Sequence, residues 1–155
     1  MILWQKSFSN FIFLPKLYPA SVTRDVAESI CAADGAELPK VITAKDKSAM
    51  MHYQNLNIVW TGLKKINNVN THCIDSACNG LLQWDDGTAY AHDASINITV
   101  EVNAANGQNC FRIRADSEHL GDLQCNSKEF PTVCQFTPPQ DYKFREGKYY
   151  RVIPW

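Results

Sequence analysis

Asp122 and two cysteines lie close together in the stretch LGDLQCNSKEFPTVCQF, which runs from residue 120 to residue 136. Asp122 precedes Cys125 by three residues, and Cys134 follows Cys125 by nine. A carboxylate in an apolar frame can ligate a cation, whereas two cysteines in an oxidising compartment form disulfides. The stretch therefore predicts either a ligand-binding corner or a disulfide-linked hairpin, and the partners of these three residues decide between them.

The chain contains six cysteines, none of them in a Cys-x-x-Cys pair. They are Cys31, Cys73, Cys78, Cys110, Cys125 and Cys134. An even number without close pairs favours a disulfide framework over a metal or redox site. A zinc site would recruit His72 or His119, but neither histidine has a second thiol at zinc-finger spacing. We therefore expect a secreted or extracellular protein.

The N-terminal residues lack the uninterrupted apolar stretch of a secretory signal. We expect that a leader was removed, or that the chain is a fragment of a longer secreted or membrane-tethered protein. The most apolar run, FIFL at 11–14, is ended by Pro15 and falls short of the roughly 20 residues that a membrane span needs. No membrane span is predicted in this chain.

A length of 155 residues with 45% hydrophobic content predicts one globular domain. The formal charge is -1 with acidic and basic residues mixed along the chain, so no basic face for nucleic acid is expected. The four histidines are scattered, and the sequence has neither a Gly-x-Ser-x-Gly motif nor a phosphate-binding glycine loop. These features predict a binding protein rather than an enzyme.

Two amphipathic helices are predicted in the N-terminal third. The first, at 21–35, has Thr23 as its expected N-cap and Gly35 as its stop signal. Its buried face is expected to carry Val26, Ala27, Ile30 and Cys31. The second, at 43–55, opens with the capping box Thr43-x-x-Asp46. Its buried side is expected to carry Ala49, Met50 and Tyr53.

Short β-prone segments follow the helices. They are LNIVWTGL at 56–63, GLLQW at 80–84, NCFRIRA at 109–115, HLGDLQC at 119–125 and FPTVCQF at 130–136. Helices followed by a run of strands predict an α+β fold with an antiparallel sheet. Between Trp84 and Cys110 about 25 residues carry few strand signals, and irregular loops of that length are usually functional.

With these elements in place, the chain resembles a short-form C-type lectin-like domain over residues 8–136. The matching features are SICAADGAEL, WTGL, WDDG, the cysteine of NCFRI, and GDLQC followed by TVCQF, in this order. The resemblance implies two helices, an antiparallel sheet and a long irregular loop, held by disulfides. Residues 137–155 would be a C-terminal tail or the start of a following segment, in which GKYYRVIPW reads as a strand, either opening a further domain or pairing with a sheet edge at 11–14.

The resemblance also implies the disulfide pairs. In the family the helix cysteine bonds the last one and the two intermediate cysteines bond each other. Carried over, Cys31 bonds Cys134 and Cys110 bonds Cys125. Cys73 and Cys78 are left to close a small local ring.

Sugar-binding members of the family hold a calcium ion with residues that can be matched to this chain. Glu101 and Asn103 stand at the ends of the tripeptide, Gln108 replaces a glutamate, and Asp122 ends the Trp-Asn-Asp position. The family's proline is replaced by Val102, for which a trans peptide bond is expected, and its asparagine is replaced by Gly121. The resemblance therefore implies a degenerate calcium site with Glu101, Asn103 and Asp122 as metal ligands and Gln108 as a further ligand-binding residue.

Three functions remain open from the sequence. The first is carbohydrate or glycoconjugate binding, with weak or altered calcium dependence, through the loop from Trp84 to Cys110. The second is calcium-independent binding of a protein ligand by the same surface. The third is a structural or extracellular-matrix role within a longer chain.

Two further features of the long loop bear on these alternatives. Asn97-Ile98-Thr99 is an N-glycosylation acceptor, and a glycan there would hinder a sugar ligand near Glu101. Trp84, Tyr90 and His92 could form a stacking surface, although Trp84 is more readily explained as packing beneath the loop. Trp60 is expected in the core.

Overall fold

The computed structural model describes residues 2–8, 15–51, 57–68, 70–103, 107–114, 116–136, 142–145 and 148–153. Its helices are α1 (Arg24–Ala33) and α2 (Ala44–Met51). Its strands are β1 (Ile2–Phe8), β2 (Lys16–Val22), β3 (Ile58–Lys65), β4 (Cys73–Ile74), β5 (Leu82–Trp84), β6 (Thr99–Val102), β7 (Cys110–Arg114), β8 (His119–Leu123), β9 (Phe130–Cys134), β10 (Tyr142–Arg145) and β11 (Lys148–Ile153). Three short 3-10 turns complete the list, at Ile66–Asn68, Asp75–Cys78 and Ala94–Ile96.

Helix α1 lies where the first helix was predicted, with one difference at its start and one on its surface. Thr23 is the N-cap residue, as predicted, although its side chain makes no capping hydrogen bond. Ala27 and Cys31 are buried as expected, whereas Val26 is 47% exposed, so its predicted burial was wrong. Gly35 ends the helix with φ 68°, a conformation that glycine adopts without steric cost.

Helix α2 begins with the predicted capping box. The Asp46 backbone N–H donates to Thr43 Oγ1 at 3.1 Å, and Asp46 Oδ2 accepts from the Thr43 backbone N–H at 2.9 Å. Met50 is buried. Tyr53 and the predicted end of the helix lie outside the described residues, and so does the side chain of Ala49.

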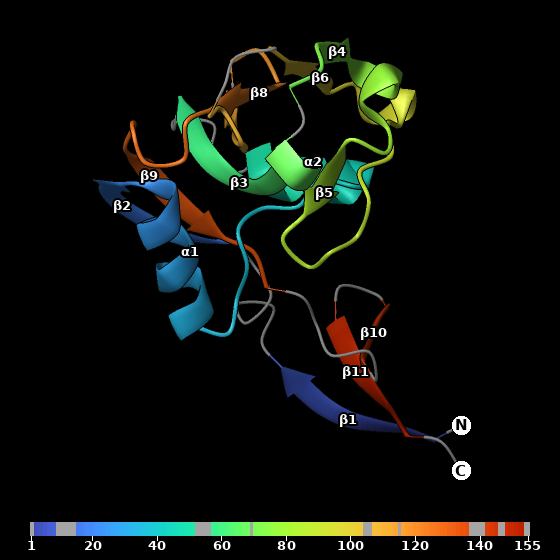
Figure 1. Cartoon of the computed structure of the whole chain (residues 1–155). Coiled ribbons are helices and arrows are strands. Elements are labelled where there is room, and N and C mark those ends of the chain that lie inside the picture. The colour runs from blue at the N-terminus through green and yellow to red at the C-terminus, as the bar shows by residue number, and fades with distance from the viewer. Residues whose placement is uncertain are drawn as a thin grey trace.

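A six-stranded sheet forms the centre of the molecule, in the order β4-β6-β8-β7-β3-β5 (Figure 1). The predicted strands around β3, β5, β7, β8 and β9 are all present. The long loop also contributes β6, which pairs in parallel with β8. The predicted α+β fold is confirmed, and the sheet is mixed because this one pair is parallel while its other pairs are antiparallel. The parallel pair arises because the chain reverses direction twice between β6 and β8, once on entering β7 and once on leaving it.

Two smaller sheets complete the described strands. β2 pairs antiparallel with β9, with Lys16 opposite Cys134. The third sheet has the order β1-β11-β10, and Figure 1 shows it apart from the six-stranded sheet. The strand predicted at the C-terminal end is therefore β11, and it pairs with β1. The segment at 11–14, proposed as its partner, lies outside the described residues.

The core has two parts on opposite sides of the central strands. The larger contains Leu63, Leu82, Trp84, Val100 and Phe111 among its most buried members. The smaller packs α1 against the sheet around Trp60, which is fully buried as predicted. None of the described helices is long and apolar enough to cross a membrane.

Three disulfides join the pairs that the resemblance implies. Cys31 bonds Cys134 across a sequence separation of 103 residues, Cys110 bonds Cys125 across 15, and Cys73 bonds Cys78 across 5. The first ties α1 to β9, and the second joins the start of β7 to the residues after β8. The third closes a ring between β4 and the turn that follows it.

Candidate functional site

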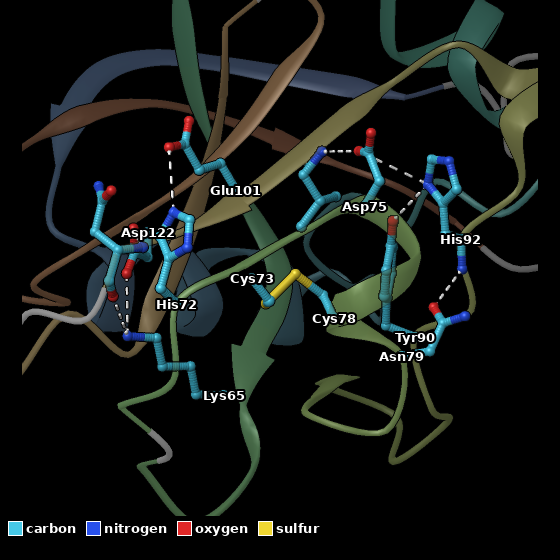
Figure 2. The surroundings of a disulfide bond; sticks show 12 residues. Lys65, His72, Cys73, Asp75, Cys78, Asn79, Tyr90, His92, Glu101 and Asp122 are labelled. Atoms are coloured by element: carbon cyan, nitrogen blue, oxygen red, sulfur yellow. Dashed lines mark hydrogen bonds and ion pairs between the residues drawn. A yellow bond between two sulfur atoms is a disulfide. The ribbon is translucent and has the colours of Figure 1, made fainter.

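An internal ion pair lies where β3, β6 and β8 meet. Lys65 is the last residue of β3, Asp122 lies in β8, and Asn103 directly follows β6. Lys65 Nζ is 3.0 Å from Asp122 Oδ2 and 3.4 Å from the Asn103 carbonyl oxygen. The Asn103 backbone N–H donates to Asp122 Oδ1 at 3.1 Å. Figure 2 shows the Lys65 amine directed at the Asp122 carboxylate. The lysine side chain therefore links the end of β3 to β8 and to the residue that follows β6.

Both members of this pair are inaccessible to solvent. The Lys65 side chain is 1% exposed and that of Asp122 is 0% exposed. A buried charge is tolerated only when a partner and hydrogen bonds replace the lost hydration. Here the lysine, one backbone carbonyl and one backbone N–H supply those partners. Loss of either charged residue would leave the other buried and unpaired.

A second cationic side chain occupies the space beside Asp122. Gly121 pairs with Arg112 across β8 and β7. A Cβ at Gly121 would lie 2.6 Å from Arg112 Nη1, so the guanidinium occupies the position of a side chain. Burial lowers the pKa of Arg112, the charge of Arg114 lowers it further, and Asp122 opposes the shift. The asparagine side chain expected here in sugar-binding relatives is thus replaced by an arginine from the neighbouring strand.

Glu101 faces away from this ion pair and toward two histidines. Its Oε2 is 3.5 Å from His119 Nε2. Its Oε1 is 3.9 Å from His72 Nε2, a contact drawn in Figure 2. Arg112 Nη1 lies 3.3 Å from His119 Nδ1, which fits a His119 tautomer with its proton on Nε2, the nitrogen nearer to Glu101. Val102 is 1% exposed and fills the core. Since side chains alternate along a strand, burial of Val102 turns Glu101 outward.

Gln108 contributes a buried oxygen to the same region. Its Oε1 and the neighbouring Asn109 Oδ1 are both buried without a hydrogen-bond partner in the described part of the chain. The Asn109 carbonyl oxygen accepts from the Lys65 backbone N–H at 3.1 Å. The segment that carries these two amides is therefore hydrogen-bonded through its backbone to the last residue of β3.

The four residues matched to a calcium site do not fit a calcium ion as they are arranged. Calcium needs six to eight oxygens at about 2.3–2.6 Å. Both oxygens of Asp122 are engaged, one by an ammonium, and that fixed positive charge repels a second cation. Glu101 is paired with histidines instead. Among the described residues no group of three or more His, Cys, Asp or Glu side chains is arranged to hold a metal.

The Cys73–Cys78 ring separates this corner from a second polar cluster. Asp75 Oδ1 accepts from the Val100 backbone N–H at 3.0 Å and lies 3.9 Å from His92 Nδ1. Tyr90 Oη is 3.1 Å from the same His92 nitrogen. Burial raises the pKa of Tyr90 to about 12, and the charge of Asp75 adds to the shift. Figure 2 shows these groups on the far side of the disulfide from Glu101. The cluster anchors the start of the long loop to β6.

The aromatic residues of the loop do not form an exposed stacking surface. Trp84 is 2% exposed and Tyr90 6% exposed, and their ring centroids lie 6.5 Å apart. Trp84 therefore packs beneath the loop, as the alternative interpretation had it. Asn97 is exposed, has φ 55° and ends the short turn at Ala94–Ile96. Its side chain is accessible, as a glycan acceptor requires.

A groove of about 280 Å³ lies elsewhere, between the 37–46 segment and the residues after β9. Lys40 and Asp86 form an ion pair in its wall, and Ile42 and Phe136 give it an apolar part. The hydrogen bonds from Lys40 and Thr88 lower the pKa of Asp86 to about 2. None of these residues was predicted as a site from the sequence.

Sequence reasoning also missed Lys65 and Arg112. A signal for Lys65 exists, because it ends a strand that is buried throughout from Val59 to Leu63. A lysine at the end of such a strand is a candidate for burial with a partner. For Arg112 the signal is its cross-strand partner Gly121, which becomes evident only once the pairing of β7 with β8 is known.

The chain matches a known protein family over most of its length. The family model for the lectin C-type domain matches residues 20–136. The crystal structure of the cow C-type carbohydrate-recognition domain of CD23, in the presence of GlcNAc2Man3 oligosaccharide, is similar with a TM-score of 0.57 and 15% identity, covering 81% of this chain and 88% of that one. No curated protein matches in sequence.

Two antifreeze proteins are similar to the same extent. A calcium-independent type II antifreeze protein has a TM-score of 0.56 and 17% identity, covering 86% of this chain and 95% of that one. A calcium-dependent type II antifreeze protein in its calcium-free form has a TM-score of 0.56 and 14% identity, covering 79% of this chain and 90% of that one. At such identities the likeness extends to the fold, and it includes both calcium-dependent and calcium-independent proteins.

Proposed function

Since the chain belongs to the family of C-type lectin domains, we propose that it is a non-catalytic binding module that recognises a protein or glycoprotein ligand without calcium. One observation carries the proposal: the carboxylate of Asp122 is already neutralised by Lys65 inside the protein. A sugar bound through a calcium ion would need that carboxylate as a metal ligand. The ligand is therefore recognised by direct contacts.

The outer side of the long loop between Trp84 and Cys110 is the surface we propose for this recognition. Asn103 and Thr99 are exposed there, and Glu101 is 40% exposed in its side chain. Ile74, opposite Glu101 on the neighbouring β4, is 48% exposed. An aliphatic side chain bordered by polar and charged ones suits contact with a protein surface.

The test is a calcium titration of the oxidised wild-type protein by calorimetry, in parallel with Asp122→Ala, followed by a glycan array with and without chelator. We expect no saturable calcium heat from the wild type and no chelator-sensitive glycan signal, because the ammonium of Lys65 repels the ion. Saturable calcium binding that disappears in Asp122→Ala, together with a glycan signal abolished by chelator, would overturn the proposal.

Carbohydrate binding with a weak or altered calcium dependence is the second candidate. It is favoured by Gln108 Oε1 and Asn109 Oδ1, which are buried without a hydrogen-bond partner in the described ranges of the chain. Amide oxygens are the kind of ligand that a hard cation takes. The same array distinguishes the two candidates. A glycan signal that chelator reduces without abolishing would favour this one.

We also propose that the protein works outside the cell. Three disulfides cross-link the chain, and such frameworks persist in oxidising compartments. Nucleic acid is not a proposed partner, because the formal charge is -1 with both signs mixed.

A further inference from the structure

We propose that the ammonium of Lys65 is the resident cation of this corner, and that Lys65 by itself excludes divalent cations from it. The inference rests on the proposed calcium independence and adds its cause. Replacement of Lys65 by a neutral residue then creates a site for a divalent cation in a corner that binds none in the wild type.

The first argument is the set of atoms that Lys65 holds together. Its Nζ contacts a carboxylate oxygen of Asp122 on β8 and the carbonyl oxygen of Asn103 after β6. A carboxylate and a backbone carbonyl are oxygen donors of the type that hard divalent cations take. The ammonium therefore contacts both strands, as a bound metal ion would.

The second argument is burial. With the Lys65 and Asp122 side chains 1% and 0% exposed, bulk salt screens this pair far less than a surface pair. If the lysine is removed, the buried carboxylate loses its direct ion pair and keeps only the longer-range charge of Arg112, so uptake of a proton or a cation becomes favourable. The Asn103 N–H at Oδ1 still holds it in place.

The third argument is that two buried side-chain oxygens belong to the segment bonded to Lys65. The Lys65 backbone N–H donates to the carbonyl of Asn109, and the side-chain oxygens of Asn109 and Gln108 are buried without a hydrogen-bond partner among the described residues. With one carboxylate and neutral oxygens, the created site would bind calcium weakly, with a dissociation constant of about 0.5 mM.

The experiment compares the wild type, Lys65→Ala and the control Lys64→Ala by thermal unfolding, in chelator, in about 5 mM calcium and in about 5 mM magnesium. Lys64 is the adjacent residue of the same strand, but its side chain is 38% exposed and its 3.5 Å contact is to Asp85. We expect the Tm of the wild type not to differ between chelator, calcium and magnesium, and we expect the same of Lys64→Ala. We expect Lys65→Ala to have a lower Tm in chelator and to regain about 4 °C in calcium.

A double variant tests whether the response comes from Asp122. In Lys65→Ala with Asp122→Asn, the calcium response is expected to disappear while the protein remains folded, because both charges are gone. A calcium response that persists in the double variant would overturn the assignment. So would a folded Lys65→Ala whose Tm does not change with calcium.

Two further measurements cover the case in which Lys65→Ala does not fold in chelator. Refolding of that variant in calcium alone would support the proposal, and failure in both conditions would overturn it. In the wild type, the amide signals of Asn103 and Asp122 are expected to be unchanged by calcium in an NMR titration. Saturable shifts there would overturn both this inference and the proposed function, whereas an unresponsive Lys65→Ala overturns the inference alone.

Discussion

Asp86 provides a local test of electrostatics in the groove. Its pKa lies at about 2, below the ordinary value of 3.8, because Lys40 and Thr88 donate to the ionised carboxylate. A lowered folded-state pKa adds stability that is present above about pH 4 and is lost as the pH falls through about 2. Acid therefore removes the benefit of this ion pair.

In Lys40→Ala, the pKa of Asp86 is expected to rise toward 3.8, because its strongest hydrogen-bond donor is gone. The variant should be less stable than the wild type above about pH 4, and the difference should vanish near pH 2. NMR titration of the Asp86 carboxyl carbon measures the pKa directly. The control is Lys16→Ala, which removes the separate pair with Asp34. A Lys40→Ala protein with an unchanged Asp86 pKa would contradict the assignment.

An ion pair links helix α1 to the turn after β5, in addition to the packing around Trp60 and the Cys31–Cys134 bond. Arg24 is 4% exposed, and its Nη2 lies 2.6 Å from Asp85 Oδ1 in the turn after β5. Its other carboxylate partner, Glu28, is 53% exposed in its side chain and 2.8 Å away. Asp85 is therefore the partner that compensates the burial of the guanidinium.

Asp85→Ala is expected to lower the free energy of unfolding by about 2–4 kcal/mol, because a buried charge loses its buried partner. Asp25→Ala is the matched control, since Asp25 is an exposed aspartate in the first turn of the same helix. Its loss should cost no more than about 1 kcal/mol through the helix dipole. Urea unfolding measures both. Equal effects would show that Arg24 does not depend on Asp85.

The elements that sequence predicted are those whose signals are local. The Thr43–Asp46 capping box fixed the start of α2, and alternating apolar residues located β3, β7 and β9. β6 was missed because it has only four residues, two of them polar, and its pairing with β8 joins segments separated in the chain. The partner of Asp122 could not be predicted for the same reason, because Lys65 lies 57 residues earlier in the chain.

The disulfides contribute unequally to the free energy of unfolding. In the chain-entropy model, the Cys31–Cys134 bond across 103 residues stabilises by about 5 kcal/mol, and the Cys73–Cys78 bond across 5 residues by about 2 kcal/mol. Paired alanine variants of each bond, unfolded in guanidinium without reductant, measure the two contributions. We expect the loss of the first to cost about twice as much as the loss of the second. Equal losses would contradict the loop-length argument.

The pairing of β2 with β9 has a mechanical consequence. Lys16 lies opposite Cys134, so tension along the chain from both sides would open this pair from its end, one hydrogen bond at a time. The opening stops at Cys31, because the bond to Cys134 carries the force from there on. At most about 50 Å of chain is released before that point. Everything between the two cysteines, including the corner formed by Lys65 and Asp122, is shielded from the pull, so the surface proposed for recognition keeps its shape when the chain is under tension.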